Sequence, residues 1–285
     1  PAPYDADRVK SLTCQDVEDE FAAGRALLEQ CAAYAAQCSR EPIPVSDLVI
    51  GMKCGGSDGL SGVTANPTVG AFSDMMIARG GSTVLTEVPE MFGAEGMLLS
   101  RCVSREVFDK AASMLNGFKD YFISHNETVY ENPSPGNKKG GITTLEDKSC
   151  GCVQKGGTAP IVDVIGYGDA VTAHGLNMLY GPGNDLVSAT AMTAAGAHIV
   201  LFTTGRGTPF GAPAPTIKIA SNSQLAAKKS GWIDFDAGPV AEGEPIADAA
   251  KRLFDLVLQV ASGQLSKSEQ LGYREIAIFK DGVTL

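Results

Sequence analysis

The sequence predicts an α/β fold in which a mostly parallel sheet is flanked by helices in Rossmann-like layers. Short apolar runs alternate with longer segments of helical periodicity along most of the 285 residues. Glycine is enriched at 33 residues and gathers in turns after the apolar runs, where tight turns are expected. Such an alternation is typical of a parallel sheet covered on both faces. We expect one catalytic α/β domain over residues 1–285, with a helical extension over residues 1–40.

Each expected strand is a short apolar run bounded by glycine, proline or polar residues. In chain order these runs are 46–52, 82–86, 161–165, 198–202, 216–220 and 274–280. Each expected helix has apolar residues at helical spacing. The helices are expected over 15–39, from Asn66 to Gly80, from Ser104 to Phe122, after a capping box of Thr143 and Glu146, over 185–195 and over 246–262.

Composition excludes several classes of protein. The net charge of -10 argues against a nucleic-acid partner, which requires a basic face. We expect no membrane partner, because no apolar run approaches the length of a membrane-spanning helix. The seven cysteines form no CxxC pair, and no secretion signal is visible, so reduced thiols in a cytoplasmic protein are expected. The chain starts at Pro1 without an initiator Met, which indicates processing or a part of a longer protein.

Polar residues and glycines concentrate in loops that follow the predicted strands. In open parallel sheets, ligands bind beyond the carboxyl ends of the strands. The segment at Asn137 joins these loops because it precedes a predicted helix, where backbone N–H groups favour an anion. The candidate residues are Cys54, Ser57, Asp58, Glu87, Glu90, Asn137, Lys138, Thr203, Thr204 and Arg206.

Each candidate also has a simpler interpretation. The glycine-rich turn at 54–59 lacks the phosphate-loop and dinucleotide fingerprints and is compatible with an ordinary turn. Glu87 and Glu90 suit metal ligation or acid–base chemistry, but equally a solvated loop. Lys138 and Arg206 suit an anion, yet surface cations are as common. Cys150-Gly151-Cys152 is spaced like a pair of metal ligands, but it lies in a predicted helix without a second pair, which disfavours a metal there.

Four loop motifs resemble the C-terminal catalytic region of the altronate/galactarate dehydratase family, over about residue 45 to the end. They are KCGGSDGLSGVTANP at 53–67, TEVPEMFGAE at 86–95, SPGNKKGG at 134–141 and FTTGRGTP at 202–209. The second motif is closer to the altronate type than to the galactarate type. Members of this family carry a small N-terminal SAF-type domain, so the resemblance implies such a domain, or a small subunit, as a missing partner.

The resemblance implies the dehydration of a small anionic sugar acid, D-altronate, to 2-dehydro-3-deoxy-D-gluconate in hexuronate catabolism. This β-elimination needs a base at the carbon beside the carboxylate and a divalent cation for the enolate-like state. The implied cation is Fe²⁺, with Mn²⁺ as an alternative. Three other functions remain open, namely galactarate dehydratase, the large subunit of a sulfolactate sulfo-lyase, and a non-catalytic sugar-acid-binding module.

The resemblance also implies roles for the candidate residues. The catalytic groups are Asp58, Glu87, Glu90 and Lys138, and the metal ligands are Cys54, Glu87 and Glu90. The substrate-binding groups are Ser57, Asn137, Thr203, Thr204 and Arg206, with Lys138 and Arg206 holding the substrate carboxylate. The sequence is also compatible with a homo-oligomer.

Overall fold

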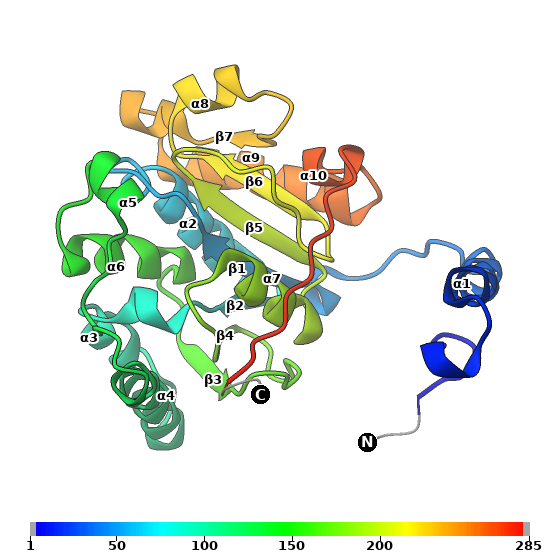
Figure 1. The fold of residues 1–285 in the computed structure, drawn as a ribbon. Helices are drawn as coiled ribbons and strands as arrows, with labels where there is room; N and C mark the ends of the chain where they lie inside the picture. Colours follow the sequence, from blue (N-terminus) through cyan, green and yellow to red (C-terminus); the bar gives the residue numbers. More distant parts are fainter. Residues whose placement is uncertain (1–3, 282–285) are drawn as a thin grey trace. The chain divides into compact units, whose positions relative to one another are not determined.

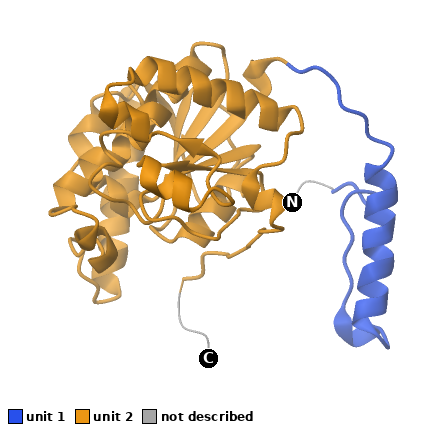
Figure 2. Ribbon diagram, turned by 90° about the horizontal axis from the view of Figure 1, so that it is seen from above, with its two compact units in different colours: residues 1–43 blue, residues 44–285 orange. Residues whose placement is uncertain are grey.

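The computed structural model describes residues 4–281 of the chain (Figure 1). It divides into two compact units, residues 1–43 and 44–285 (Figure 2). The first unit holds a short 3-10 helix, η1 (Cys14–Asp16), and helix α1 (Glu20–Ala35). The carboxylate of Asp19 accepts hydrogen bonds from the backbone N–H groups of Phe21 and Ala22, so it caps α1 at its N-terminus. The helix is therefore shorter than the predicted 15–39.

The second unit is built on a seven-stranded sheet in which every strand pair is parallel. This confirms the predicted α/β class. The strand order is β3-β4-β2-β1-β5-β6-β7, which places β1 at the centre between β2 and β5. The strands are β1 (Val49–Cys54), β2 (Ser82–Leu85), β3 (Ile161–Ile165), β4 (Leu176–Leu179), β5 (Ile199–Thr204), β6 (Thr216–Ala220) and β7 (Phe235–Asp236).

The two faces of the sheet are covered by different helices. Because side chains alternate along a strand, Leu201 of β5 joins the core beneath α2 (Ala65–Ile77) and α9 (Ile246–Ala261). Its neighbour Phe202 joins the separate core beneath α7 (Asp185–Ala194). Figure 1 shows α2 and α9 behind the sheet and α7 in front of it. Both faces are therefore apolar, as expected of a parallel sheet.

The remaining helices surround the sheet and the loops at its carboxyl edge. Among them, α4 (Arg105–Ser124) is the long helix capped by Ser104, as predicted, and its apolar side joins the same core as α2. These remaining helices are η2 (Val45–Asp47), η3 (Val88–Met91), α3 (Glu95–Leu99), α4 (Arg105–Ser124), α5 (Pro135–Lys139), α6 (Leu145–Val153), η4 (Gln154–Gly156), α8 (Ser223–Lys228), η5 (Gly238–Glu242) and α10 (Lys267–Gln270). None of the helices within 4–281 is long and apolar enough to cross a membrane.

Several predicted elements differ from the structure. Residues 274–280 form no strand, because their backbone N–H groups bond to a loop carbonyl and to side chains, such as the Tyr167 hydroxyl that accepts from Phe279. The cap of α6 is Thr144, which accepts from Asp147 N, and not Thr143. Helix α2 begins at Ala65, because the Asn66 amide bonds to other segments and does not cap the helix.

Candidate active site

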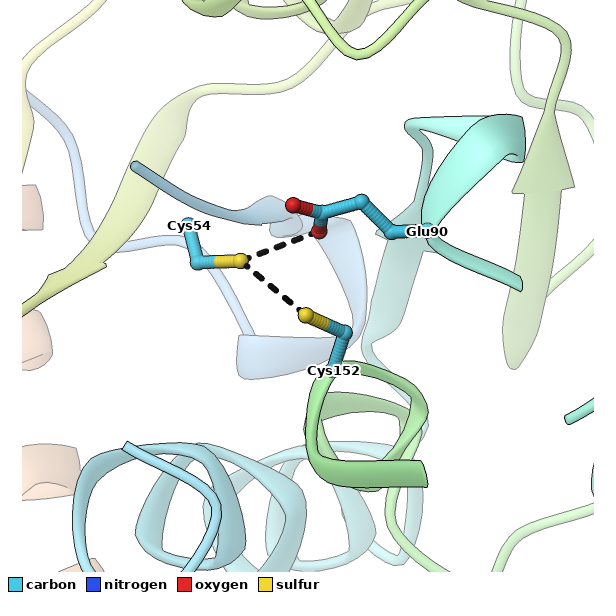
Figure 3. Close-up of side chains that lie close together, drawn as sticks. All are labelled: Cys54, Glu90 and Cys152. Atoms are coloured by element: carbon cyan, nitrogen blue, oxygen red, sulfur yellow. Dashed lines mark hydrogen bonds between the residues drawn. The ribbon is translucent and has the colours of Figure 1, made fainter. Parts of the chain in front are cut away.

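Three buried side chains meet beyond the carboxyl end of β1. Cys54 is the last residue of β1, Glu90 lies in η3 after β2, and Cys152 lies in α6. The Cys54 Sγ atom is 3.0 Å from Glu90 Oε2 and 3.4 Å from Cys152 Sγ. All three ligand atoms lie within 4.8 Å of one another (Figure 3). We call these residues the thiol–carboxylate cluster.

Two buried lysines surround this cluster. Lys148 Nζ donates to Glu90 Oε1 at 2.8 Å. Lys155 Nζ lies 3.0 Å from Cys54 Sγ and 3.5 Å from Glu90 Oε2. Both come from the segment that carries Cys152, since Lys148 lies in α6 and Lys155 in η4. Their charges offset the cost of burying the Glu90 carboxylate away from water.

A third buried lysine connects the cluster to Glu87. Lys53 Nζ donates to Glu87 Oε1 at 3.0 Å and to Asp185 Oδ1 at 2.5 Å. The other Glu87 oxygen accepts from the backbone N–H of Cys54 at 3.2 Å. Glu87 has a φ of 67°, a left-handed conformation that costs a non-glycine residue about 1–3 kcal/mol. The bonds to Lys53 and Cys54 hold Glu87 in this strained conformation.

The surroundings of the cluster lower the pKa of both the Cys54 thiol and the Glu90 carboxyl group. The hydrogen bond from Cys152 lowers the pKa of the Cys54 thiol to about 6, against burial and the Glu90 charge, with help from Lys155 and Lys148. The same hydrogen bond raises the pKa of Cys152, which therefore keeps its proton. Burial raises the pKa of Glu90, but Lys148 and Lys155 outweigh it and hold that pKa well below the ordinary value.

Glu87 behaves differently from Glu90 although both are buried. Burial raises the pKa of Glu87 to about 8, and the negative charge of Glu90 adds to the effect, while Lys53 opposes it. Glu87 therefore carries a proton near neutral pH, whereas Glu90 is ionised. Two carboxyl groups whose pKa values are pushed apart in this way are typical of acid–base sites.

The donor set of the cluster fits a divalent metal of intermediate softness. Two sulfur ligands and one carboxylate oxygen suit ions such as Fe²⁺ and Zn²⁺ better than Mg²⁺ or Ca²⁺. Three protein ligands also leave a coordination position for a substrate, as in catalytic metal sites. The structure thus brings Cys54 and Glu90 together as the sequence predicts and adds Cys152. The Glu87 oxygens bond instead to Lys53, Cys54 N and, at 3.5 Å, Ser188.

A partly open cavity of about 190 Å³ lies beside the cluster and reaches Cys152. Ser57 and Asp58 line it from the loop after β1, and Lys148 lines it from α6. Asp58 Oδ1 accepts from the hydroxyls of Ser61 and Ser221, and Oδ2 accepts from Asn222, so this carboxylate also organises its loop. We call this space the cluster cavity.

The other predicted residues lie around the same sheet edge with local partners. Thr203 Oγ1 donates to Asn66 Oδ1 at 2.7 Å, and Thr204 Oγ1 accepts from the N–H groups of the 206–207 turn. Asn137 Nδ2 donates to the Ser57 carbonyl, and Asn137 Oδ1 accepts from Ser134 in a capping box. These bonds shape the loops, and the predicted substrate contacts of Thr203, Thr204 and Asn137 stay predictions.

Lys138 and Arg206 do not line the cluster cavity, although the cavity of Arg206 shares Asp58 with it. Lys138 is exposed and lines a cavity of about 380 Å³ with Tyr130 and Thr143. Arg206 is exposed and lines another cavity, of about 600 Å³, with Lys139 and other residues. The structure therefore does not bring these two cations together with the cluster.

Sequence reasoning missed Cys152, Lys53, Lys148 and Lys155. Three of them carry a readable signal, because positions 148, 152 and 155 follow the spacing of one helical face. Cys150 and Cys152, by contrast, point about 200° apart on a helix, so they cannot chelate one ion together. Lys53 is a lysine inside a buried strand, which is a rare position for that residue.

Residues 45–284 match the family model described as D-galactarate/Altronate dehydratase, C-terminal.

The chain belongs to this family.

Three curated relatives show where it falls within the family. The chain is 56% identical to the altronate dehydratase of Bacillus subtilis (strain 168) over 98% of its length and 53% identical to that of Escherichia coli (strain K12) over 99%. It is 40% identical to the galactarate dehydratase (L-threo-forming) of E. coli over 95% of its length. These alignments cover 56%, 57% and 54% of the relatives, so the chain spans about half their length. The predicted family is confirmed, and the altronate type is the more similar.

Proposed function

We propose that this chain carries the active site of a sugar-acid dehydratase that converts D-altronate to 2-dehydro-3-deoxy-D-gluconate and water. The buried thiol–carboxylate cluster beside a partly open cavity carries this proposal, because it combines a metal donor set with room for a small molecule. The names of the two relatives that are 56% and 53% identical support the altronate type over galactarate.

Cys54, Glu90 and Cys152 would hold the metal, which we propose to be Fe²⁺ with Mn²⁺ as the alternative. When bound, it supplies positive charge against the substrate carboxylate as the enolate-like state develops. Lys155 contacts both Glu90 and Cys54 and so sets their orientation. Lys53 and Glu87 fix the backbone of Cys54 from the other side.

Asp58 is the predicted catalytic residue that lines the cluster cavity, and we assign proton abstraction to it. Its carboxylate takes the proton from the carbon beside the substrate carboxylate. The electron pair of that C–H bond forms the carbon–carbon double bond, and the 3-hydroxyl group leaves with a proton as water. The resulting enol becomes the 2-keto acid by tautomerisation, so the reaction loses one water and needs no oxidant.

Reducing conditions are part of the proposal, because the cluster depends on free thiols at Cys54 and Cys152. Free thiols at these two positions support a cytoplasmic location, where thiols are kept reduced. The relatives extend well beyond the matched region, which supports a SAF-type domain or a small subunit as a partner, and a homo-oligomer is compatible with this scheme.

The test is to incubate the chain with Fe²⁺ or Mn²⁺ and a reductant, supplying D-altronate, galactarate and sulfolactate in separate reactions. We expect a 2-keto acid from altronate, with less from galactarate and no sulfite from sulfolactate. Cys152→Ser should lose both bound metal and turnover, whereas Cys102→Ser, at a half-buried thiol outside the cluster, should keep both. If the metal-loaded chain forms no product from any of the three acids, the dehydratase proposal is refuted. A non-catalytic sugar-acid-binding module would then be the remaining function.

A further inference from the structure

The cluster cavity lies directly beside the thiol–carboxylate cluster and is lined by polar side chains. It lies between the loop after β1 and α6, and its volume of about 190 Å³ has room for a small molecule. At Cys152 it borders the thiol–carboxylate cluster, since Cys152 Sγ lies 3.4 Å from Cys54 Sγ. A ligand in this cavity is therefore next to the groups that would hold the metal.

Lys148 is the one cation among the described residues that line this cavity. Its side chain is only 8% exposed, and one N–H bond goes to Glu90 Oε1 at 2.8 Å. The next acceptor, Asn137 Oδ1, is at the longer distance of 3.4 Å. An ammonium group has three donors, so Lys148 retains bonding capacity for a further acceptor in the cavity. Burial among fixed partners also means that little side-chain freedom is lost when that acceptor binds.

The two acidic residues that line the cavity are already bonded to the protein. Asp58 accepts bonds on both oxygens, and Asp147 Oδ2 accepts from the backbone N–H of Thr143. Ser57 is different, because its hydroxyl is buried and has no hydrogen-bond partner within residues 4–281. A buried hydroxyl without a partner is costly and points to a ligand that supplies one. The cavity thus offers a charged donor and an unpaired hydroxyl.

We propose that Lys148 receives the carboxylate of the substrate in the cluster cavity and that the Ser57 hydroxyl bonds to the neighbouring substrate hydroxyl. The ligand class is a small 2,3-dihydroxy carboxylate. This inference rests on the proposed dehydratase function and specifies the cation that recognises the acid. Lys138 and Arg206 do not line this cavity, although the cavity of Arg206 shares Asp58 with it, and their predicted contacts with the carboxylate stay predictions.

The test compares the binding of D-altronate with that of altritol, a neutral hexitol that has a hydroxymethyl group in place of the carboxylate. Binding to metal-loaded protein is measured by calorimetry, and metal content is measured alongside. Lys148→Met should raise the Kd of altronate roughly 10- to 100-fold, the range for a hydrogen bond to a charged group, and leave that of altritol unchanged. Lys148→Arg should restore part of the affinity, and the exposed Lys251→Met should bind like the wild type.

A serine pair tests the same site without removing a charge. Ser57→Ala should weaken altronate binding about 2- to 10-fold. Ser149 offers a matched control, because its hydroxyl is also buried without a partner in the described chain but does not line the cavity. Ser149→Ala should therefore bind altronate like the wild type. This pair decides the question if Lys148→Met fails to fold.

The outcomes separate the inference from the function on which it rests. Wild-type turnover of altronate together with an unchanged Kd in Lys148→Met would overturn the inference and leave the function standing. If Lys148→Met loses metal but keeps its altronate affinity, Lys148 only positions Glu90. That outcome would also overturn the inference that Lys148 binds the substrate carboxylate. A wild-type chain that neither binds nor dehydrates altronate would refute the proposed function itself.

Discussion

Gly70 of α2 allows a close approach between that helix and η4, the segment after Cys152 that carries Lys155. A Cβ atom added at Gly70 would fall inside the contact distance of the Gln154 carbonyl oxygen and only 3.2 Å from the backbone of Gly157. Both obstacles are backbone atoms, so no side-chain rotation relieves the clash. Gly70→Ala must therefore push α2 and η4 apart.

The cost of this change follows from the packing. Overpacking a core costs about 1–3 kcal/mol, and here the displaced atoms belong to η4, which follows directly after Cys152 and carries Lys155. We expect a loss of about 3 kcal/mol in the free energy of unfolding. The displacement should also weaken metal binding, because Lys155 and Cys152 move relative to Cys54.

Gly117 gives the matched control, since it also lies inside a helix but a Cβ there meets no atom within 4 Å. Gly117→Ala should stabilise the protein by about 0.5–1 kcal/mol, because alanine loses less backbone entropy on folding. Urea unfolding followed by circular dichroism measures both variants. The packing argument is refuted if Gly70→Ala unfolds at the same urea concentration as the wild type or at a higher one.

Three further predictions concern stability in other parts of the chain. Lys53→Met should lose about 1–3 kcal/mol in urea unfolding, because it leaves the buried Glu87 carboxyl group and the Asp185 carboxylate without their hydrogen-bond donor. Lys251→Met, in an exposed ion pair, should lose less than about 1 kcal/mol, and equal losses would contradict the role of burial. Burial lowers the pKa of Lys218 from 10.5 to about 8, so the unfolded chain binds more protons between these values. The free energy of unfolding of the wild type should consequently rise relative to that of Lys218→Met as the pH increases from about 8 to 10.5. Urea unfolding at several pH values measures this, and a constant difference between the two proteins would contradict the expectation. Ser104→Ala removes the cap of α4 and should cost about 1 kcal/mol by thermal unfolding, a result that an unchanged melting temperature would exclude.

The sheet was predictable where a strand carried a long apolar run with clear boundaries. The strands around residues 50, 84 and 200 satisfy that condition. Strand β4 does not, because Asn177 interrupts its apolar run and donates its side-chain amide to carbonyls of the preceding loop. Residues 274–280 alternate apolar and polar side chains as a strand does, yet the backbone N–H groups of Glu275, Ala277 and Phe279 bond to a loop carbonyl and to side chains instead of to a strand.

The site was predictable only as far as chain topology determines it. Cys54, Glu87 and Glu90 follow β1 and β2, and the carboxyl ends of adjacent parallel strands must lie together. Cys152 is 98 positions from Cys54 along the chain, and its place in the cluster depends on how α6 docks. Local sequence patterns carry no information about such docking, so the cluster emerges only from the three-dimensional structure.

The charges around the cluster also fix how α6 sits against the sheet. A slip of α6 by one helical turn would move its residues by 5.4 Å along the axis. Such a slip would carry Lys148 away from its 2.8 Å bond to Glu90 and leave a buried carboxylate and a buried ammonium without partners. Apolar contacts alone tolerate a sliding helix far better than paired charges do. The same groups that prepare the site for chemistry therefore exclude competing registers of the fold around it.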